Sequence, residues 1–270
     1  MLERPFGRRK GKTEMKIFTA EIITKLHQLL PSLNGNQIRF VMDIIGVLSE
    51  PFEYKNCYDK SMFSEDYFDI FADYVRIHHA LSDEPFTKDK FEYALNRSCK
   101  VLGIPSSLPG RTNPGHDIEI NGIKISLKTQ ADMHINENYI HISKFMELGK
   151  GKWETESDLY LFRDKFISHM NNYDQIITLR CLSTKNEREN GLWKYEMIKI
   201  PKELLMKAKR GRFEMKENSN QNPKPGYCYV NENDEALFEL YFDGGGERKL
   251  QIKKILKSNC IVLANFAFNK

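Results

Sequence analysis

The stretch GHDIEINGIKISLKTQ, residues 115–130, decides the fold of this chain. Its centre is the dipeptide Asn121-Gly122, the strongest short signal for a β-hairpin, because both central positions of a type I′ turn need a positive φ. Alternating apolar residues on either side of the dipeptide supply the two strands. The register that follows from this turn pairs Ile120 with Ile123, Glu119 with Lys124, Ile118 with Ile125 and Asp117 with Ser126.

The predicted hairpin has one apolar and one polar face, because side chains alternate along a strand. Isoleucine and leucine form the apolar face, which we expect to be buried. Directly opposed residues lie about 5 Å apart, so Asp117 and Lys128 should converge beside Ser126. An ordinary half-exposed hairpin is the simpler interpretation of the same pattern. The residues of the polar face are Asp117, Glu119, Lys124, Ser126, Lys128 and Gln130.

The period of the apolar residues divides the chain into a helical part and a part rich in strands. We expect a flexible basic lead over 1–14 (Met15 is an alternative start), a helical region over 15–102, and an α/β core over 103–270 that forms one compact domain with it. Helices are predicted at 65–80, 88–102, 157–171 and 201–209. Strands are predicted at 116–120, 123–129, 139–143, 174–181, 194–200, 226–230, 236–242 and 259–268.

Composition places the chain among globular proteins, with 270 residues, 40% hydrophobic residues and a formal net charge of +4. This mildly basic balance permits a polyanionic partner without requiring one. The five cysteines form no CxxC pair, which argues for reduced thiols and against a structural zinc site. The first residues contain no apolar secretory segment, and no apolar run is long enough to span a bilayer. We therefore expect a cytoplasmic protein without a membrane partner.

The order of the elements around the hairpin resembles the PD-(D/E)xK nuclease superfamily. A predicted helix is followed by NPGHD, which delivers Asp117 to the start of a strand, and the hairpin ends in ISLKTQ, which holds Lys128. The LKT ending is similar to that of restriction endonucleases and of mismatch-repair nicking enzymes of the MutH type. The segments RTNPGHD and ALNRS are similar to restriction enzymes of the SmaI type.

This resemblance implies a fold and an activity. The fold would be α/β, with a restriction-endonuclease-like mixed β-sheet core flanked by helices and a helical N-terminal layer. The activity would be that of a type II restriction endonuclease, which hydrolyses phosphodiester bonds in double-stranded DNA at a specific, palindromic site. Cutting both strands of a palindrome needs two symmetric sites, so a homodimer is expected. A cognate DNA methyltransferase would act on the same site without needing to bind the enzyme.

Phosphodiester hydrolysis of this kind needs a divalent cation, and Mg²⁺ prefers oxygen ligands such as carboxylates. The resemblance implies Asp117 as the metal ligand, the main-chain carbonyl of Leu127 as its neighbour, and Lys128 beside the attacking water and the phosphate. Whether that lysine acts as a base or as an electrostatic clamp stays open. Ser126 occupies the position where the family has its second acid, so Glu119 on the same face or Glu92 in the preceding helix must replace it.

Two groups of residues are candidates for contacting DNA. Arg111, Thr112 and Asn113 immediately precede the hairpin, so they should lie beside the catalytic residues. A basic segment over 207–226 interleaves lysine and arginine with asparagine and glutamine, which suits phosphates and base edges. A solvated surface loop is the equally weighted alternative for this segment. Its candidate DNA ligands are Arg210, Arg212, Lys216 and Lys224.

Other patterns are weaker. His134 and His141 are too far apart in sequence to make a convincing metal pair. The run Asp243-Gly244-Gly245-Gly246 invites a phosphate-loop interpretation, but no GK[ST] follows it, and a glycine turn explains it better. A non-catalytic DNA-binding module that keeps a degenerate nuclease fold is the alternative function. An α/β binding protein unrelated to nucleic acid is a further one.

Overall fold

The computed structural model describes residues 14–56, 63–110, 115–150 and 152–270. The chain forms two compact units, Met1–Gly46 and Val47–Lys270. The described part of the first unit consists of helix α1 (Glu14–Leu29), the 3-10 turn η1 (Leu30–Ser32) and most of helix α2 (Gly35–Ser49). Both helices leave large apolar side chains exposed, among them Ile22, Ile23, Leu26, Leu29, Ile38, Phe40, Met42 and Ile45.

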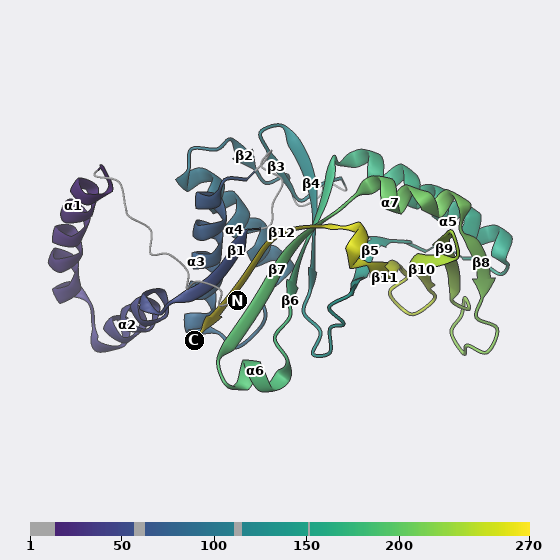
Figure 1. Ribbon diagram of the computed structural model, residues 1–270. Helices are drawn as coiled ribbons and strands as arrows, with labels where there is room; N and C mark the ends of the chain where they lie inside the picture. The colour runs from purple at the N-terminus through teal and green to yellow at the C-terminus, as the bar shows by residue number, and fades with distance from the viewer. Residues whose placement is uncertain (1–13, 57–62, 111–114, 151) are drawn as a thin grey trace, which may run out of the picture. The chain divides into compact units, whose positions relative to one another are not determined.

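In the described part of the second unit, the strands form two sheets (Figure 1). The first has the order β1-β12-β7-β6-β4-β3-β2, and its pairs are antiparallel except for β4 and β6. Its strands are β1 (Phe52–Asn56), β2 (Ser106–Ser107), β3 (Ile118–Ile120), β4 (Ile123–Gln130), β6 (Gln175–Cys181), β7 (Leu192–Ile200) and β12 (Ile261–Asn269). The second sheet is antiparallel, and it consists, in spatial order, of β5 (Tyr139–Glu147), β11 (Lys249–Leu256), β10 (Glu235–Asp243), β9 (Gly226–Glu232) and β8 (Arg212–Met215).

The second unit has two apolar cores, because one set of helices packs on the seven-stranded sheet and another set packs on the five-stranded sheet. Helices α3 and α4 pack on the seven-stranded sheet through Phe71, Phe91 and Leu95. Helix α5 and the short helix α7 pack on the five-stranded sheet (Figure 1). The helices are α3 (Glu65–Leu81), α4 (Lys88–Val101), α5 (Glu156–His169), α6 (Lys185–Glu189) and α7 (Lys202–Met206), with 3-10 turns η2 (Met170–Asn172), η3 (Lys207–Arg210) and η4 (Lys257–Asn259). Among the described residues, no helix combines the length and the apolar character that crossing a membrane requires.

The hairpin has the predicted turn and register. Asn121 and Gly122 have φ values of 51° and 79°, as a type I′ turn requires. Ile118 pairs with Ile125, and Glu119 pairs with Lys124. The apolar face is buried as expected.

The interpretation as an ordinary half-exposed hairpin holds near the turn, where Glu119 stands opposite the exposed Lys124, but it is wrong for the end of β4, whose polar face is covered. This strand pairs with β3 on one side and, in parallel, with β6 on the other. The beginning of β5 also lies against its end, where the backbone N–H of His141 donates to the side chain of Gln130. Ser126 and Gln130, on the polar face, are consequently only 3% and 7% exposed.

Four strands of the second unit were not predicted, and the shortest of them is β2, which has two residues and pairs with β3. β1 lies within the range 15–102, predicted to be helical, and it is held by pairing with the distant β12. β11 begins with the alternation Leu250, Ile252, but Lys254 with φ 53° marks an irregularity that shifts the next inward residue to Ile255. β8 is a four-residue edge strand, so the prediction of a single loop over 207–226 needs correction.

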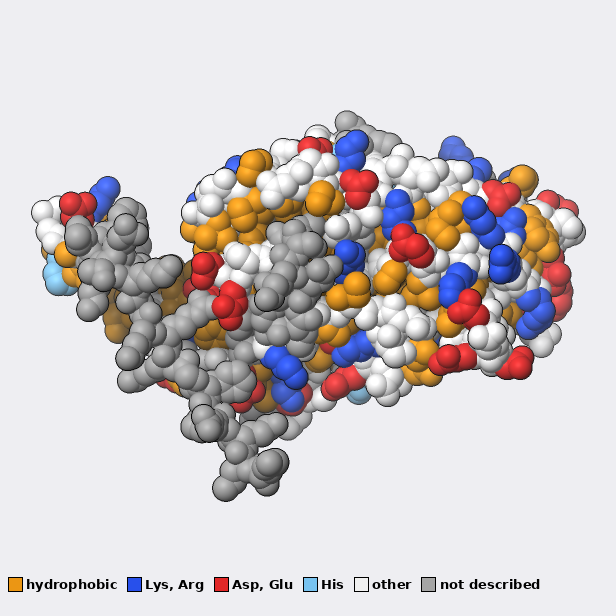
Figure 2. Space-filling view, turned by 45° about the horizontal axis from the view of Figure 1, so that its top comes forward, with side chains coloured by type: hydrophobic (Ala, Val, Ile, Leu, Met, Phe, Trp, Pro, Cys, Tyr) orange, Lys and Arg blue, Asp and Glu red, His pale blue; other side chains and the backbone are white. Residues whose placement is uncertain are grey.

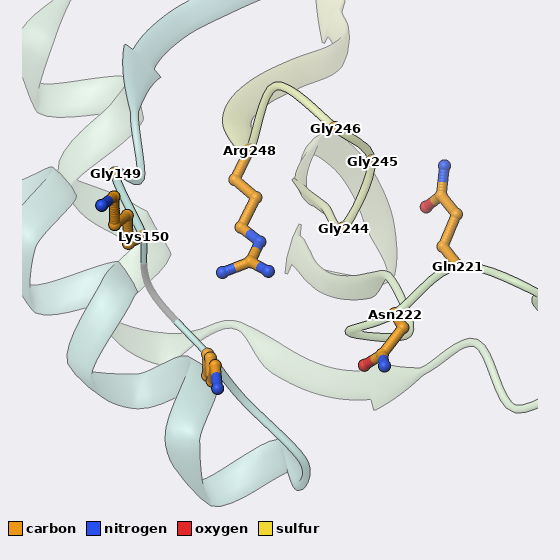
Figure 3. Close-up of a pocket in the computed structure, with 9 residues that line it drawn as sticks. Gly149, Lys150, Gln221, Asn222, Gly244, Gly245, Gly246 and Arg248 are labelled. Carbon is orange, nitrogen blue, oxygen red and sulfur yellow. The ribbon is translucent and has the colours of Figure 1, made fainter.

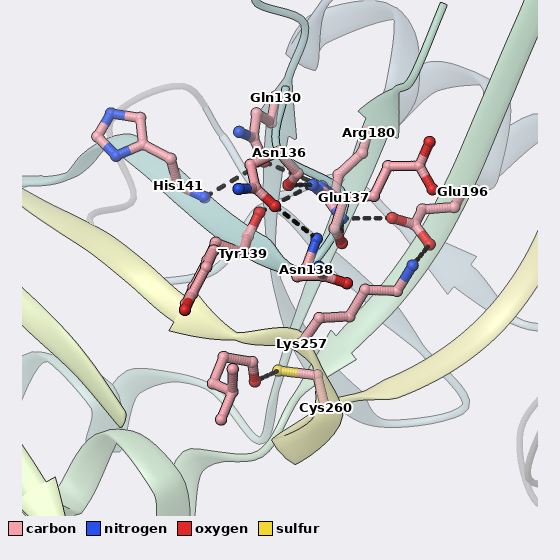
Figure 4. Close-up of polar contacts among 11 residues, drawn as sticks. Gln130, Asn136, Glu137, Asn138, Tyr139, His141, Arg180, Glu196, Lys257 and Cys260 are labelled. Carbon is pink, nitrogen blue, oxygen red and sulfur yellow. Dashed lines mark hydrogen bonds and ion pairs between the residues drawn. The ribbon is translucent and has the colours of Figure 1, made fainter. Parts of the chain in front are cut away.

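A buried ion network joins the two sheets where β4 leads into β5 (Figure 4). Arg180 on β6 forms an ion pair with Glu196 on β7, and both side chains are buried. The same guanidinium donates to the carbonyls of Asn136 and Tyr139, at 2.8 Å each. Lys257, from the connection between β11 and β12, lies 2.6 Å from the other oxygen of Glu196. The network therefore fixes the segment that carries the chain from one sheet to the other.

Candidate active site

Asp117 is fixed to the neighbouring strand just before β3 begins. Its backbone N–H donates to the carbonyl of Ile125 at 2.9 Å, which places the residue as the hairpin register predicts. Its Oδ2 accepts the backbone N–H of Leu127 at 2.6 Å and the Ser126 hydroxyl at 3.3 Å. One carboxylate oxygen is thus held by the strand, and the other is directed toward α4.

Helix α4 brings a lysine and a second acid to this free oxygen. The Lys88 ammonium lies 2.6 Å from Asp117 Oδ1 and 3.3 Å from Glu92 Oε1. Lys88 and Glu92 are one helical turn apart, so they share a face of the helix. Burial acts to lower the pKa of Lys88, but the two carboxylates outweigh it and the pKa is raised. Burial, together with the charge of Asp117, raises the pKa of Glu92 against the opposing effect of Lys88.

Lys128 lies two residues after Ser126, on the same face of β4. Burial lowers the pKa of Lys128 to about 8, while the charge of the nearby Asp117 opposes the shift. Its ammonium is 5.4 Å from the ring centroid of Phe145 on β5. A pocket of about 380 Å³ opens between the two sheets here, and its lining includes Lys88, Lys128, Lys144 and Phe145. Asp117 and Glu92 do not line this pocket themselves. Each forms an ion pair with Lys88, which does line it.

Two aromatic residues, His169 at the end of α5 and Tyr173 just after it, complete the surroundings of the site. Burial lowers the pKa of His169, and the charge of Lys128 adds to this effect. Burial raises the pKa of Tyr173, and the charge of Asp117 acts in the same direction. The Tyr173 hydroxyl is buried and, among the described residues, has no hydrogen-bond partner. His169 therefore lies within electrostatic range of both Lys128 and Asp117, and Tyr173 within range of Asp117.

Of the two acids considered as replacements at Ser126, the structure brings Glu92 to Asp117. Glu119 lies 4.0 Å from the imidazole of His116 and stands opposite Lys124 in the hairpin. The hairpin face alone could not distinguish the two, because the helix that carries Glu92 reaches the site only through tertiary packing. Lys88 was not predicted. Its signal was the pair Lys88–Glu92 at helical spacing in the first turns of α4.

Those predicted DNA ligands that the structure describes do not lie at this pocket. Arg111, Thr112 and Asn113 lie outside the described residues. The others lie at the far end of the five-stranded sheet, where Arg212 stacks over Tyr229 and pairs with Glu214 at 3.0 Å. On the face shown in Figure 2, lysine and arginine side chains are numerous at this end, interspersed with acidic ones. The remaining members of the set are Arg210 at the end of η3, Lys216 directly after β8, and Lys224, which pairs with Glu217.

The donor set around Lys88 fits a magnesium ion. The described residues contain no cluster of three or more histidine, cysteine or acidic side chains that could hold a metal. Mg²⁺ needs only one or two carboxylates, because it keeps several waters and binds substrate phosphates. The carboxylates of Asp117 and Glu92 already converge on one cation, the ammonium of Lys88.

A mixed α/β sheet whose hairpin presents an aspartate and a lysine to a pocket, with a second acid on the preceding helix, is the arrangement of a restriction-endonuclease-like enzyme. The comparisons with known proteins specify the family. The chain belongs to the SmaI family of type II site-specific deoxyribonucleases, whose family model matches residues 26–268. It is similar to the type II restriction enzyme SmaI of Serratia marcescens, with 46% identity over 216 residues, which cover 78% of this chain and 84% of that protein. No solved structure matches the chain.

The chain is therefore a type II restriction endonuclease, which confirms the predicted enzyme class, fold class and family resemblance. Among the described residues, Cys99, Cys181, Cys228 and Cys260 carry free thiols, and the first three of these are buried. Cys57 lies outside the described residues.

Proposed function

We propose that this endonuclease uses Mg²⁺ held by Asp117 and Glu92, with the main-chain carbonyl of Leu127 completing the protein ligands. The observation that carries the proposal is the Lys88 ammonium, which lies within 2.6 Å and 3.3 Å of the two carboxylates. A position that is already shaped for one cation by two acids can accept another. When bound, the ion neutralises charge on the phosphate and lowers the pKa of the attacking water.

The protein groups have separate tasks in this proposal. The backbone of Leu127 and the hydroxyl of Ser126 hold the Asp117 carboxylate in one orientation, so it needs no reorganisation when the cation arrives. Lys88 and Lys128 both line the pocket. An ion between the carboxylates would take over the contacts of Lys88, whose ammonium then remains available to the phosphate. Lys128 would orient the water and stabilise the developing negative charge.

The first experiment incubates the full chain with long unmethylated DNA, with Mg²⁺ and separately with EDTA. Discrete Mg²⁺-dependent fragments are expected, and their ends give the recognition site, which we propose is palindromic. Cleavage that continues at full rate in EDTA would overturn the proposed metal. We further propose a cytoplasmic enzyme whose cognate methyltransferase protects the same site, so methylated DNA from the source cell should resist cleavage.

Exchanging Glu92 for glutamine should lower the cleavage rate at limiting Mg²⁺ by about 100-fold, because the ion loses one of its two charged ligands. The measurement is the single-turnover rate as a function of Mg²⁺ concentration. Glu119→Gln is the matched control, because it removes the other candidate acid, which lies on the hairpin. This variant should leave the cleavage rate within about twofold of the wild-type rate. A slow Glu119→Gln with a normal Glu92→Gln would assign the second ligand to Glu119.

Exchanging Lys128 for methionine should stabilise the metal-free protein at pH 7 by about 1–3 kcal/mol. Because burial lowers the pKa of Lys128 to about 8, the unfolded chain binds more protons than the folded one between that pH and 10.5, the ordinary pKa of a lysine. The resulting destabilisation is present below pH 8 and is relieved as the pH rises. Urea unfolding at pH 7 and pH 9.5 measures the difference between the two proteins. A gap that stays constant or widens with pH would contradict the shift.

We propose that the active form is a homodimer, because cutting both strands at a palindrome needs two symmetric sites. The exposed apolar residues of α1 support a second copy as the occupant of that surface. Ile22, Leu26 and Leu29 lie at the spacing of one helical stripe and are 51%, 40% and 52% exposed.

Light scattering should give twice the chain mass of 31.7 kDa. The variant Ile22→Asp/Leu26→Asp should give the single mass, whereas Lys25→Asp on the same helix should stay dimeric. A wild-type protein that is monomeric at micromolar concentration, alone and with DNA, would exclude the homodimer.

A further inference from the structure

A second pocket, of about 580 Å³, lies at the end of the five-stranded sheet (Figure 3). Three cationic side chains reach it from two separate segments, namely Lys150, Lys152 and Arg248. Gln221 and Asn222, from the loop between β8 and β9, line the pocket as well. Arg248 extends into the space between Lys150 and that loop. Among the described residues that line the pocket, none is acidic.

Three consecutive glycines, Gly244, Gly245 and Gly246, form one side of this pocket. A Cβ on Gly244 would lie 1.8 Å from the carbonyl oxygen of Pro223, so the two loops can pack this closely only because Gly244 has no side chain. The nearby carboxylate of Asp243 does not line the pocket, and both of its oxygens have donors, since it accepts the Gly245 N–H and a hydrogen bond from Gln251, both at 3.0 Å. The glycine run that ends β10 is thus a turn, as its sequence indicated, and this turn also forms one side of a cationic hollow.

Strand β5 connects the two pockets. The active-site pocket includes residues up to Met146, and the second pocket begins at Gly149. The acids between them, Glu147 and Glu247, are both bound by Lys144. β5 ends at Glu147, and the chain turns at Gly149, where φ is 62°. Even fully extended, the chain from Phe145 to Lys150 would cover at most about 17 Å at ~3.3 Å per residue, so the two pockets lie within roughly five base-pair steps of 3.4 Å along duplex DNA.

We propose that the pocket of Lys150, Lys152 and Arg248 binds backbone phosphates of the same DNA, within about five base pairs of the bond that is cut. This inference rests on the proposed position of that bond beside Asp117 and Lys128. Lysine and arginine neutralise phosphates, and backbone contacts fix the register of a duplex without reading its sequence. The paired acids between the two pockets do not oppose a passing backbone as free carboxylates would.

The test uses a fluorescein-labelled duplex that contains a site cut by the wild-type protein, with EDTA present to prevent cleavage. Binding is measured by anisotropy over a range of salt concentrations. Each lost phosphate contact reduces the salt slope by about 0.9, so Lys150→Ala/Lys152→Ala should reduce it by about 1.8. The matched control Lys100→Ala/Lys185→Ala removes the same charge from α4 and α6 and should leave the slope unchanged.

Position is tested with duplexes in which single phosphates are replaced by neutral methylphosphonates. Wild type should lose affinity for replacements at one or two positions within about five base pairs of the cut, and the Lys150→Ala/Lys152→Ala variant should be insensitive to those same replacements. If wild type cuts DNA but the double variant keeps the wild-type salt slope, the phosphate site is excluded and the nuclease assignment stands. The phosphate site is likewise excluded if the Lys150→Ala/Lys152→Ala variant loses binding of inorganic phosphate but binds the duplex with the same affinity as wild type. A wild type that neither binds nor cuts DNA would instead remove the proposed function.

Discussion

Replacing Asp117 by asparagine should reduce the rate of DNA cleavage by at least about 10³-fold, which corresponds to roughly 4 kcal/mol of lost transition-state stabilisation. The amide has the shape of the carboxylate, and its oxygen can still accept the Leu127 N–H that holds Asp117 at 2.6 Å. What it lacks is the negative charge that attracts a cation. The measurement is the single-turnover rate at saturating Mg²⁺, together with the far-UV spectrum and melting temperature of the variant.

A second aspartate that holds β4, Asp174 just before β6, provides the control for this experiment. Asp174 holds the opposite end of β4, since its Oδ2 accepts the Lys124 N–H at 2.8 Å. Asp174→Asn therefore makes the same chemical change to an aspartate that holds the same strand, away from the pocket. It should cut DNA at the wild-type rate. If Asp117→Asn retained more than a tenth of the activity, this carboxylate would not be a metal ligand.

Replacing Arg180 by methionine should destabilise the protein by about 3–5 kcal/mol, because it leaves the buried Glu196 without its closest partner. The carbonyls of Asn136 and Tyr139 lose their donor in the same step. These carbonyls belong to the connection from β4 to β5, so the two walls of the active-site pocket should also lose their fixed spacing. Urea unfolding measures the stability, and the cleavage rate of the folded fraction measures the effect on the site.

Arg188 provides the comparison for this variant. It donates to the carbonyls of Ala131 and Asp132 at the start of the same connection, at 3.2 Å each, but it is only partly buried. Arg188→Met should therefore cost no more than about 1–2 kcal/mol. Adding Glu196→Gln to Arg180→Met should recover part of the loss, because the buried charge is then removed. Equal losses for the two arginine variants would show that the ion pair adds nothing to the hydrogen bonds.

The hairpin could be predicted from the sequence in detail, because its information is local. Asn121-Gly122 fixes the turn, the turn fixes the register, and the alternation of side chains then places Asp117 beside Ser126. Lys128 follows from the same geometry. The family resemblance extended this local inference to an enzyme class that the comparisons confirm.

Features that depend on contacts between distant parts of the chain could not be predicted from the sequence as well. Glu92 could be named but not chosen over Glu119, because the choice depends on how α4 packs against β4. Lys88 was not predicted, since nothing in its own neighbourhood shows that Asp117 lies 2.6 Å away. Strand β1 is held by β12, more than two hundred residues away in sequence, and no local pattern carries such a pairing.

The position of Lys88 between two carboxylates has a consequence for how the enzyme can be handled. In many metalloproteins a chelator unfolds the chain, because the ligand charges repel one another once the ion is gone. Here the acids keep a counter-ion that is part of the chain, so their charges stay balanced when the metal leaves. The melting temperature should therefore be the same in EDTA and in buffer. Prolonged storage in the chelator should leave the protein intact, with full activity restored as soon as magnesium is added back.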